Sequence, residues 1–332
     1  MNDLEAEHRL HAERLQPGKF RDPDITATGA ERARVALERL ETLWINTGTL
    51  CNITCRNCYI DSSPTNDRLV YMTADEVRSY LDEIETLGLG TREIGFTGGE
   101  PFMNPHIIQM LDDALSSGFR ALVLTNAMQP MMRPRVQAGL RDLCARHGDR
   151  LVLRVSLDHF TAGLHDDERG GGSFARVLEG IDWLSAEGIS IAVAGRTCWG
   201  ETLEAAREGY RALFAARGWA IDADDPAALV LFPEMDETRD VPEITTECWR
   251  ILDKSPASVM CASSRMVVKR KGAGAPAVLP CTLLAYDEAF EMGATLAQSL
   301  TADGGALDNG KVKLNHPHCA RFCVLGGASC SG

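Results

Sequence analysis

Short apolar segments alternate with longer amphipathic ones from Leu43 to about residue 235, and this alternation constrains the fold more than any other feature. The apolar segments have the length of strands and lie at residues 43–47, 93–97, 121–125, 151–157, 189–195 and 228–232. Helices are predicted between them, near residues 74–87, 105–117, 132–147, 174–187 and 202–217. Such alternation is typical of a parallel sheet with right-handed crossovers. The sequence therefore predicts an α/β fold, a partial (β/α)6 TIM-like barrel.

This interpretation divides the chain into three parts. Residues 1–41 contain two polar, helix-like stretches and are predicted to form a helical N-terminal extension. Residues 42–240 form the barrel, and residues 241–332 form a small cysteine-rich C-terminal domain. In barrels of this type the active site gathers at the C-terminal ends of the strands. We therefore expect functional residues directly after the predicted strands.

Composition excludes several classes of protein. The net charge of −13 argues against sequence-independent nucleic-acid binding, which needs a basic surface to neutralise phosphates. No apolar run approaches the length of a membrane span, and the charged first residues do not resemble a signal peptide. Eleven cysteines without an export signal indicate reduced thiols and metal binding. A cytoplasmic protein is expected.

Cys51, Cys55 and Cys58 lie in the stretch CNITCRNCY, directly after the first predicted strand. Cysteine thiolates are the ligands that iron–sulfur clusters use, and three of them can hold three irons of a [4Fe-4S] cubane. The fourth iron would stay open to a small molecule. Structural zinc is the alternative, but zinc sites usually pair their ligands at C-x2-C spacing, and here the first gap is three residues. At 332 residues the chain has no need of disulfides.

Four spaced motifs resemble the radical S-adenosylmethionine (radical SAM) superfamily. They are the cysteine loop with Tyr59, the stretch IGFTGGEP at residues 94–101, the stretch ALVLTNA, and RVSLDHF with the later HDDERGGGSF at residues 154–174. The resemblance covers residues 42 to about 235. It implies that S-adenosylmethionine chelates the open iron and that one electron from the cluster cleaves the cofactor. The resulting 5′-deoxyadenosyl radical would take a hydrogen atom from the substrate.

The resemblance also implies roles for the residues of the second motif. Gly98 and Gly99 would let the backbone approach the methionyl group, because neither has a side chain. The Glu100 carboxylate would pair with the ammonium group of the cofactor. The ring of Tyr59 would cover the cluster or the adenine. The alternative for the two glycines is an ordinary turn at the end of a strand.

Later strands are implied to supply the rest of the cofactor site. Ser156 would contact the ribose hydroxyls, with Asp158 on the same side of its strand, although both could simply cap the strand end. Arg196 would clamp the cofactor carboxylate, with a surface salt bridge as the alternative. Phe232 would pack against adenine, or it is a plain core residue. Cys198 could return a hydrogen atom to a substrate radical, but a packing thiol is the simpler interpretation.

A second group of cysteines follows residue 240: Cys248, Cys261, Cys281, Cys319, Cys323 and Cys330. Two of them, Cys261 and Cys281, bracket a predicted hairpin, and three lie close to the end of the printed sequence. The pattern resembles the SPASM and Twitch domains, which carry auxiliary iron–sulfur clusters, although the close C-x2-C pair of a full SPASM domain is missing. One auxiliary [4Fe-4S] cluster is expected.

The ligands of this auxiliary cluster are predicted as Cys261, Cys281, Cys323 and Cys330, with Cys319 as the rival for one place. Zinc is the alternative metal, because four thiolates suit it equally well and His316 and His318 are also available. Cys248 is assigned to neither metal and could be a substrate-side or structural thiol.

The predicted function is that of a radical SAM oxidoreductase or maturase. The substrate would be a small molecule or a peptide, oxidised through the auxiliary cluster, and the electron donor a protein such as flavodoxin or ferredoxin. Two alternatives stay open. One is a non-catalytic iron–sulfur scaffold or electron carrier, for which an intact cofactor motif is unnecessary. The other is a peptide epimerase with Cys198 as hydrogen donor.

Overall fold

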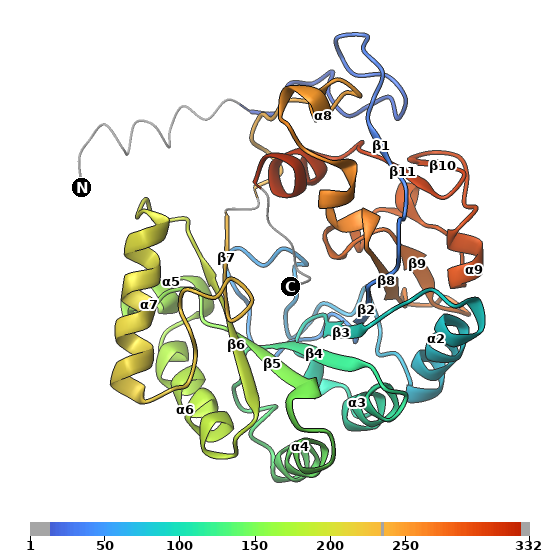
Figure 1. Ribbon diagram of the computed structural model, residues 1–332. Helices are drawn as coiled ribbons and strands as arrows, with labels where there is room; N and C mark the ends of the chain where they lie inside the picture. Colours follow the sequence, from blue (N-terminus) through green and yellow to red (C-terminus); the bar gives the residue numbers. More distant parts are fainter. Residues whose placement is uncertain (1–13, 234–235, 327–332) are drawn as a thin grey trace.

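The computed structural model describes residues 14–233 and 236–326. Within this part of the chain, the main sheet has the strand order β7-β6-β5-β4-β3-β2-β8-β9 (Figure 1). Its strands are Thr42–Asn46 (β2), Glu93–Thr97 (β3), Arg120–Thr125 (β4), Leu151–Ser156 (β5), Ser190–Arg196 (β6), Leu229–Phe232 (β7), Ser264–Val268 (β8) and Ala277–Leu279 (β9). All neighbours from β7 to β8 are parallel, and β9 is antiparallel to β8. The sheet is an open, partial barrel.

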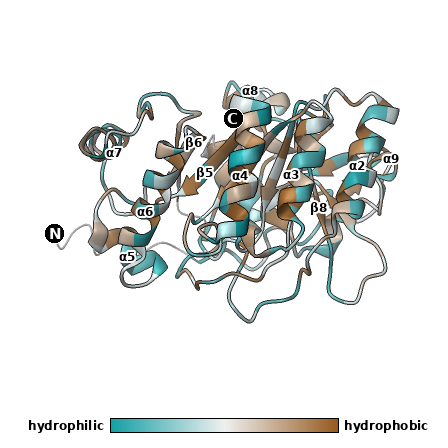
Figure 2. Cartoon of the chain, turned by 90° about the horizontal axis from the view of Figure 1, so that it is seen from below, coloured by the Kyte–Doolittle hydropathy of each residue, from teal (hydrophilic) through white to brown (hydrophobic). Residues whose placement is uncertain are grey.

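Helices cover the outer face of this sheet (Figure 1). They are Ala74–Leu87 (α2), Ile107–Ser116 (α3), Pro134–His147 (α4), Ala162–Arg169 (α5), Ser173–Ala186 (α6) and Leu203–Arg217 (α7). Figure 2 shows apolar and polar residues on different sides of α2, α3 and α4. Apolar helix faces buried against the sheet stabilise both layers, because each removes the other from water. This packing fixes the strand ends that carry the site.

Local sequence explains why α2 begins and ends where it does. Thr73 accepts a hydrogen bond from the backbone of Glu76, and the Glu76 side chain accepts one from the backbone of Thr73. This reciprocal capping box satisfies two amide groups that the first helical turn leaves without partners. Gly88 ends the helix in the left-handed conformation, at φ 60°.

The six strands and five helices predicted from the sequence are confirmed, with their ends shifted by at most about two residues. Parallel strands covered on both faces are apolar throughout, which is why short apolar runs such as β2 were sufficient signals; all five residues of β2 are buried. Helix α5 was not predicted. It is short and highly charged, so it lacks the apolar repeat by which helices are recognised.

The C-terminal residues continue the sheet of the barrel. Strand β8 pairs in parallel with β2, so residues after 241 extend the sheet of the barrel. The predicted hairpin is present as β8 and β9, with Met266 opposite Leu279. The remaining short elements are Cys248–Ile251 (α8), Leu296–Ser299 (α9), Leu307–Asp308 (β10), Lys311–Lys313 (β11) and a π-helix at Cys319–Leu325.

The N-terminal extension differs from its prediction where the structure describes it. Residues 14–41 contain no helix and supply one short strand, Arg34–Val35 (β1), which pairs with β11. The buried guanidinium of Arg32 forms an ion pair of 2.6 Å with Glu243. Polar, charged sequence suggested solvated helices, but the segment instead packs against the C-terminal region by backbone pairing and buried charges (Figure 1).

Candidate functional site

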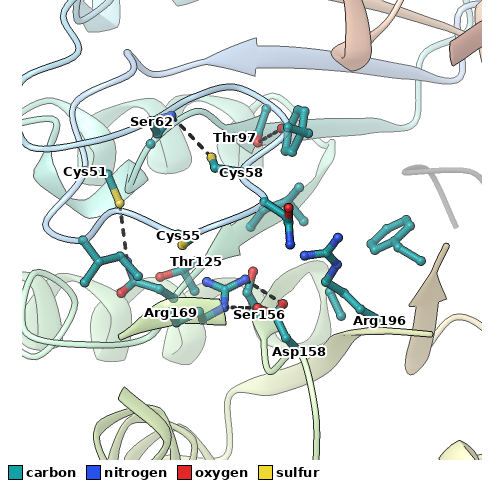
Figure 3. A pocket seen from close by; sticks show the side chains of 18 of the residues that line it. Cys51, Cys55, Cys58, Ser62, Thr97, Thr125, Ser156, Asp158, Arg169 and Arg196 are labelled. Atoms are coloured by element: carbon teal, nitrogen blue, oxygen red, sulfur yellow. Dashed lines mark hydrogen bonds and ion pairs between the residues drawn. The ribbon is translucent and has the colours of Figure 1, made fainter. Parts of the chain in front are cut away.

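The three cysteines of the first loop line one cavity of about 150 Å³ at the C-terminal ends of the strands. Figure 3 shows the sulfurs of Cys51, Cys55 and Cys58 around this cavity. Burial raises the pKa of the Cys51 thiol to about 12, and it also raises the pKa of Cys55. Burial thus makes the Cys51 and Cys55 thiols harder to deprotonate, so a bound metal ion would have to displace their protons.

Gly98 and Gly99 hold the end of β3 against the start of the cysteine loop. A Cβ on Gly99 would lie 2.2 Å from the carbonyl oxygen of Leu50, and one on Gly98 would lie 2.4 Å from that of Gly48. The Gly99 amide donates to the Gly48 carbonyl at 2.8 Å. Gly98 also has φ +137°, which side chains disfavour. Both glycines line the cavity, and both are required for this close backbone contact.

Glu100 is fully buried and organises the strand ends. Its carboxylate accepts hydrogen bonds from the Thr125 hydroxyl and from the backbone amide of Asn126, both at 2.8 Å. Burial raises the pKa of Glu100 to about 7, against the effect of these donors. Glu100 is not among the residues that line the cavity, whereas Thr125 and Asn126 are. In this structure Glu100 therefore joins β3 to β4 beneath the cavity wall.

Ser156 and Asp158 both line the cavity, but Asp158 already has a partner. Its carboxylate accepts hydrogen bonds from Nε and Nη2 of Arg169, at 2.7 and 2.9 Å (Figure 3). Burial alone would lower the pKa of Arg169, but the charges of Asp158 and of Cys55 raise it above its ordinary value. The sequence analysis assigned no role to Arg169, although it lies within the motif HDDERGGGSF.

Glu168 connects the cysteine loop to the end of β6. Its carboxylate accepts hydrogen bonds from the Asn57 amide at 2.9 Å and from Nη1 of Arg196 at 3.0 Å. Its backbone carbonyl accepts the amide of Arg56 at 2.8 Å. Arg196 lines the cavity and keeps its Nε buried without a partner in the described structure. Arg196 is thus ion-paired on one side and open to a ligand on the other.

Two predicted aromatic residues lie in the cavity wall. The Tyr59 hydroxyl is 3.1 Å from the Thr97 hydroxyl, and the Phe232 ring stacks on Phe322 with 5.9 Å between ring centroids. Cys198, the proposed hydrogen donor, is not among the residues that line this cavity. The structure therefore brings together every cofactor-binding candidate except Glu100, and it leaves Cys198 outside.

The second cysteine group is assembled from three distant segments. Four thiols line a second, small cavity: Cys261, Cys281, Cys319 and Cys323. Burial raises the pKa values of Cys319 and Cys323 well above the ordinary thiol value, and the charges of Cys281 and Cys261 raise both further. Cys330 lies outside the described residues. Cys248 is elsewhere, where its sulfur accepts the amide of Thr245 at 3.3 Å.

The spacing of possible ligands bears on zinc. Tetrahedral zinc with Zn–S bonds of about 2.3 Å holds its sulfurs about 3.8 Å apart. Among the described residues, one group of three possible ligands has its ligand atoms all within 4.8 Å of one another: Glu237, His316 and His318. This group contains no cysteine. The Nδ1 of His316 accepts the backbone amide of His318 at 3.1 Å. Within the described residues, neither cysteine group has three sulfurs that all lie within 4.8 Å of one another.

An outer cavity of about 490 Å³ adjoins the first one. The two share wall residues, namely Asn57, Cys58, Tyr59, Arg196 and Leu283. Its remaining wall includes six charged side chains, namely Arg56, Arg68, Asp61, Asp236, Glu237 and Asp287. His316 and His318 also line it, and burial lowers the pKa of both. A polar substrate of mixed charge could reach the inner cavity from this side.

Comparisons with known proteins agree with this geometry. Residues 45–208 match the model of the Radical SAM superfamily. The chain is 32% identical over 145 residues to the antilisterial bacteriocin subtilosin biosynthesis protein AlbA of Bacillus subtilis (strain 168). It is 30% identical over 140 residues to the mycofactocin maturase MftC of Mycobacterium ulcerans (strain Agy99). These alignments cover 43% and 42% of this chain, but only 30% and 35% of the relatives.

Solved structures show the same fold at low sequence identity. Streptococcus suis SuiB bound to S-adenosylmethionine has a TM-score of 0.56 at 12% identity, over 79% of this chain and 65% of that chain. Native anSMEcpe with bound AdoMet has a TM-score of 0.55 at 13% identity, over 79% and 80%. The predicted barrel is thus a radical SAM fold. No helix in the described residues is both long and apolar enough to span a membrane.

Proposed function

We propose that this protein is a radical SAM enzyme that oxidises a peptide. The observation that carries the proposal is the convergence of Cys51, Cys55 and Cys58 on one cavity that the glycine pair and Arg196 also line. When bound, a [4Fe-4S] cluster would supply the electron that cleaves S-adenosylmethionine, and the 5′-deoxyadenosyl radical so released would take a substrate hydrogen atom.

The residues of the inner cavity fit the cofactor by their chemistry. The three thiols offer soft ligands for three irons and leave the fourth iron open. Ser156 lines the cavity and its hydroxyl would hydrogen-bond the ribose, and the unpartnered Nε of Arg196 would donate to the cofactor carboxylate. Phe232 offers an apolar surface to adenine.

A peptide is the substrate class that the relatives favour. AlbA and MftC are named as a bacteriocin biosynthesis protein and a maturase, and SuiB was solved bound to the precursor peptide SuiA. The outer cavity supports this choice, because its mixed charges suit a backbone with charged side chains. An external reducing partner such as flavodoxin or ferredoxin would deliver electrons to the first cluster.

We further propose that Cys261, Cys281, Cys319 and Cys323 hold one auxiliary [4Fe-4S] cluster. Four thiols in one cavity complete the ligation of such a cluster, and full ligation suits electron transfer. Net oxidation of the substrate then follows, with the auxiliary cluster as electron acceptor.

Anaerobic reconstitution with iron and sulfide followed by a 5′-deoxyadenosine assay tests the proposal. With dithionite and S-adenosylmethionine, the wild-type protein should release 5′-deoxyadenosine. An iron–sulfur protein that never cleaves the cofactor would instead be an electron carrier or scaffold. Candidate precursor peptides, encoded beside this gene, can then be screened by mass spectrometry for the loss of two hydrogens. Modification without that mass change would contradict net oxidation.

A further inference from the structure

Arg265 is a buried arginine whose side chain the proposed chemistry has not yet used. It lies on β8 with no exposed surface, next to Cys261 and Cys281. Its Nη1 donates to the carbonyl oxygens of Cys261 at 2.7 Å and Ser264 at 2.8 Å. Its Nε and Nη2 are buried and have no hydrogen-bond partner within the described structure.

This guanidinium lacks the counter-charge that a buried cation needs. An unpaired charge is costly to bury, because water no longer solvates it. Two other buried arginines have carboxylate partners: Arg32 pairs with Glu243 at 2.6 Å and Arg196 with Glu168 at 3.0 Å. Arg265 forms no such ion pair with the described residues.

Within the described structure, the groups whose charge would act on Arg265 are the side chains of Cys261 and Cys281. Burial lowers the pKa of Arg265 to about 10, and the charges of Cys261 and Cys281 oppose this decrease. Thiolates that ligate a cluster at Cys261 and Cys281 would supply the missing counter-charge.

We propose that Arg265 is the internal counter-charge of the auxiliary cluster and raises its reduction potential. This proposal rests on the proposed function, because it assumes a cluster at Cys261, Cys281, Cys319 and Cys323. A cluster with four thiolate ligands is negatively charged and gains one more negative charge on reduction. A fixed positive charge in a low-dielectric interior stabilises the reduced form more than the oxidised form. The positive charge of Arg265 thus makes the cluster a better electron acceptor.

The direct test is a redox titration followed by electron paramagnetic resonance. Wild type, Arg265→Gln and Arg265→Lys are compared, each in the full chain and in a background with Cys51, Cys55 and Cys58 changed to Ala. We expect a more negative midpoint potential for the auxiliary cluster in Arg265→Gln and a smaller shift in Arg265→Lys, which keeps the charge. In the full chain the first cluster serves as internal control and should keep its midpoint. An unchanged or more positive auxiliary midpoint in Arg265→Gln overturns the proposal.

A second measurement separates the charge effect from a general folding defect. The increase in Tm on reconstitution is measured for wild type and for Arg265→Gln, with Arg265→Met in its place if the Gln variant does not fold. We expect a smaller increase in the neutral variants, because the cluster then loses its compensating charge. An equal increase contradicts the proposal. If the background without the first three cysteines holds no cluster while Arg265 is intact, the proposed function itself fails.

Discussion

The first cysteine group comes from one loop, whereas the second is gathered from a turn before β8, the end of β9 and the C-terminal π-helix. The first group faces a cavity that connects to the outside through the charged outer cavity. In the second group, Cys261, Cys281 and Cys319 are buried and Cys323 is half-buried. This difference matches two roles. An accessible site with three thiols can bind a small molecule, and a buried site with four thiols can store and pass on an electron.

The two cysteine groups also differ in whether the arginines near them have carboxylate partners. Near the first group, Arg169 is neutralised by Asp158 and Arg196 is paired with Glu168. Near the second group, Arg265 has no carboxylate partner in the described structure. The first site is therefore balanced before any cofactor binds, whereas the second is left with a positive charge that an anionic cluster would compensate.

The largest expected effect separates the two groups by function. Replacing Cys51, Cys55 and Cys58 together by Ala should abolish 5′-deoxyadenosine formation and remove one cluster's worth of iron. The auxiliary cluster should survive, because its ligands lie in other segments. Cys144→Ala, which changes a thiol on α4, is the matched control and should keep full activity and iron. Continued cleavage of S-adenosylmethionine by the triple variant contradicts the assignment of the first site.

A substitution in the second cysteine group should give the complementary result. Cys319→Ala is expected to remove the auxiliary cluster and the oxidised product, while cleavage of S-adenosylmethionine without substrate continues. Iron analysis and the 5′-deoxyadenosine assay check both halves of this expectation. The same measurements on Cys330→Ala identify the fourth ligand. If Cys330→Ala loses the cluster and Cys319→Ala keeps it, the set of four proposed here is wrong.

The raised pKa of Glu100 predicts that the stability of the protein depends on pH through the site of the first cysteine group. Its folded-state pKa is raised by burial from 4.5 to about 7. The stability that it contributes is therefore fully present below pH 4.5 and is lost as the pH rises to about 7. The loss amounts to about 3 kcal/mol in the cluster-free protein, at about 1.4 kcal/mol for each pKa unit. Denaturant titrations of wild type and Glu100→Gln at several pH values check this. Identical pH dependence in the two proteins would count against it.

The smallest expected effect concerns the contact between β3 and the cysteine loop. Gly99→Ala should destabilise the protein by about 1–3 kcal/mol, because its Cβ would overlap the Leu50 carbonyl. The loop would have to move, so cluster incorporation should also fall. Gly171→Ala is the matched control, since a Cβ there meets no atom within 4 Å. Equal denaturation midpoints for the two variants would contradict this prediction, because they would show that the strand end accommodates a Cβ at residue 99.

The sequence was sufficient for the parts of the molecule that local pattern determines. Buried parallel strands such as β2 are short apolar runs, and the first cysteine group is contiguous. Pairing over long sequence distance was not predictable. Nothing local indicates that β8 joins β2, or that residues 14–41 pack against the C-terminal region.

The charge network of the first site was missed for a similar reason. Glu168 and Arg169 lie on a short, charged helix that has no apolar repeat, so their positions carried no signal. Their partners, Asn57, Asp158 and Arg196, come from three other segments. For the second cysteine group, spacing alone could not rank Cys319 against Cys330, and the fold brings Cys319 into the cavity.

The central claim, two separate iron–sulfur sites in one chain, is tested most directly by anomalous diffraction from crystals of the reconstituted protein. Data collected at the iron edge should show one peak between Cys51, Cys55 and Cys58 and another between Cys261, Cys281, Cys319 and Cys323. Data collected at the zinc edge should show no additional signal at either position. A single iron peak, or a zinc peak at the second site, would contradict the account.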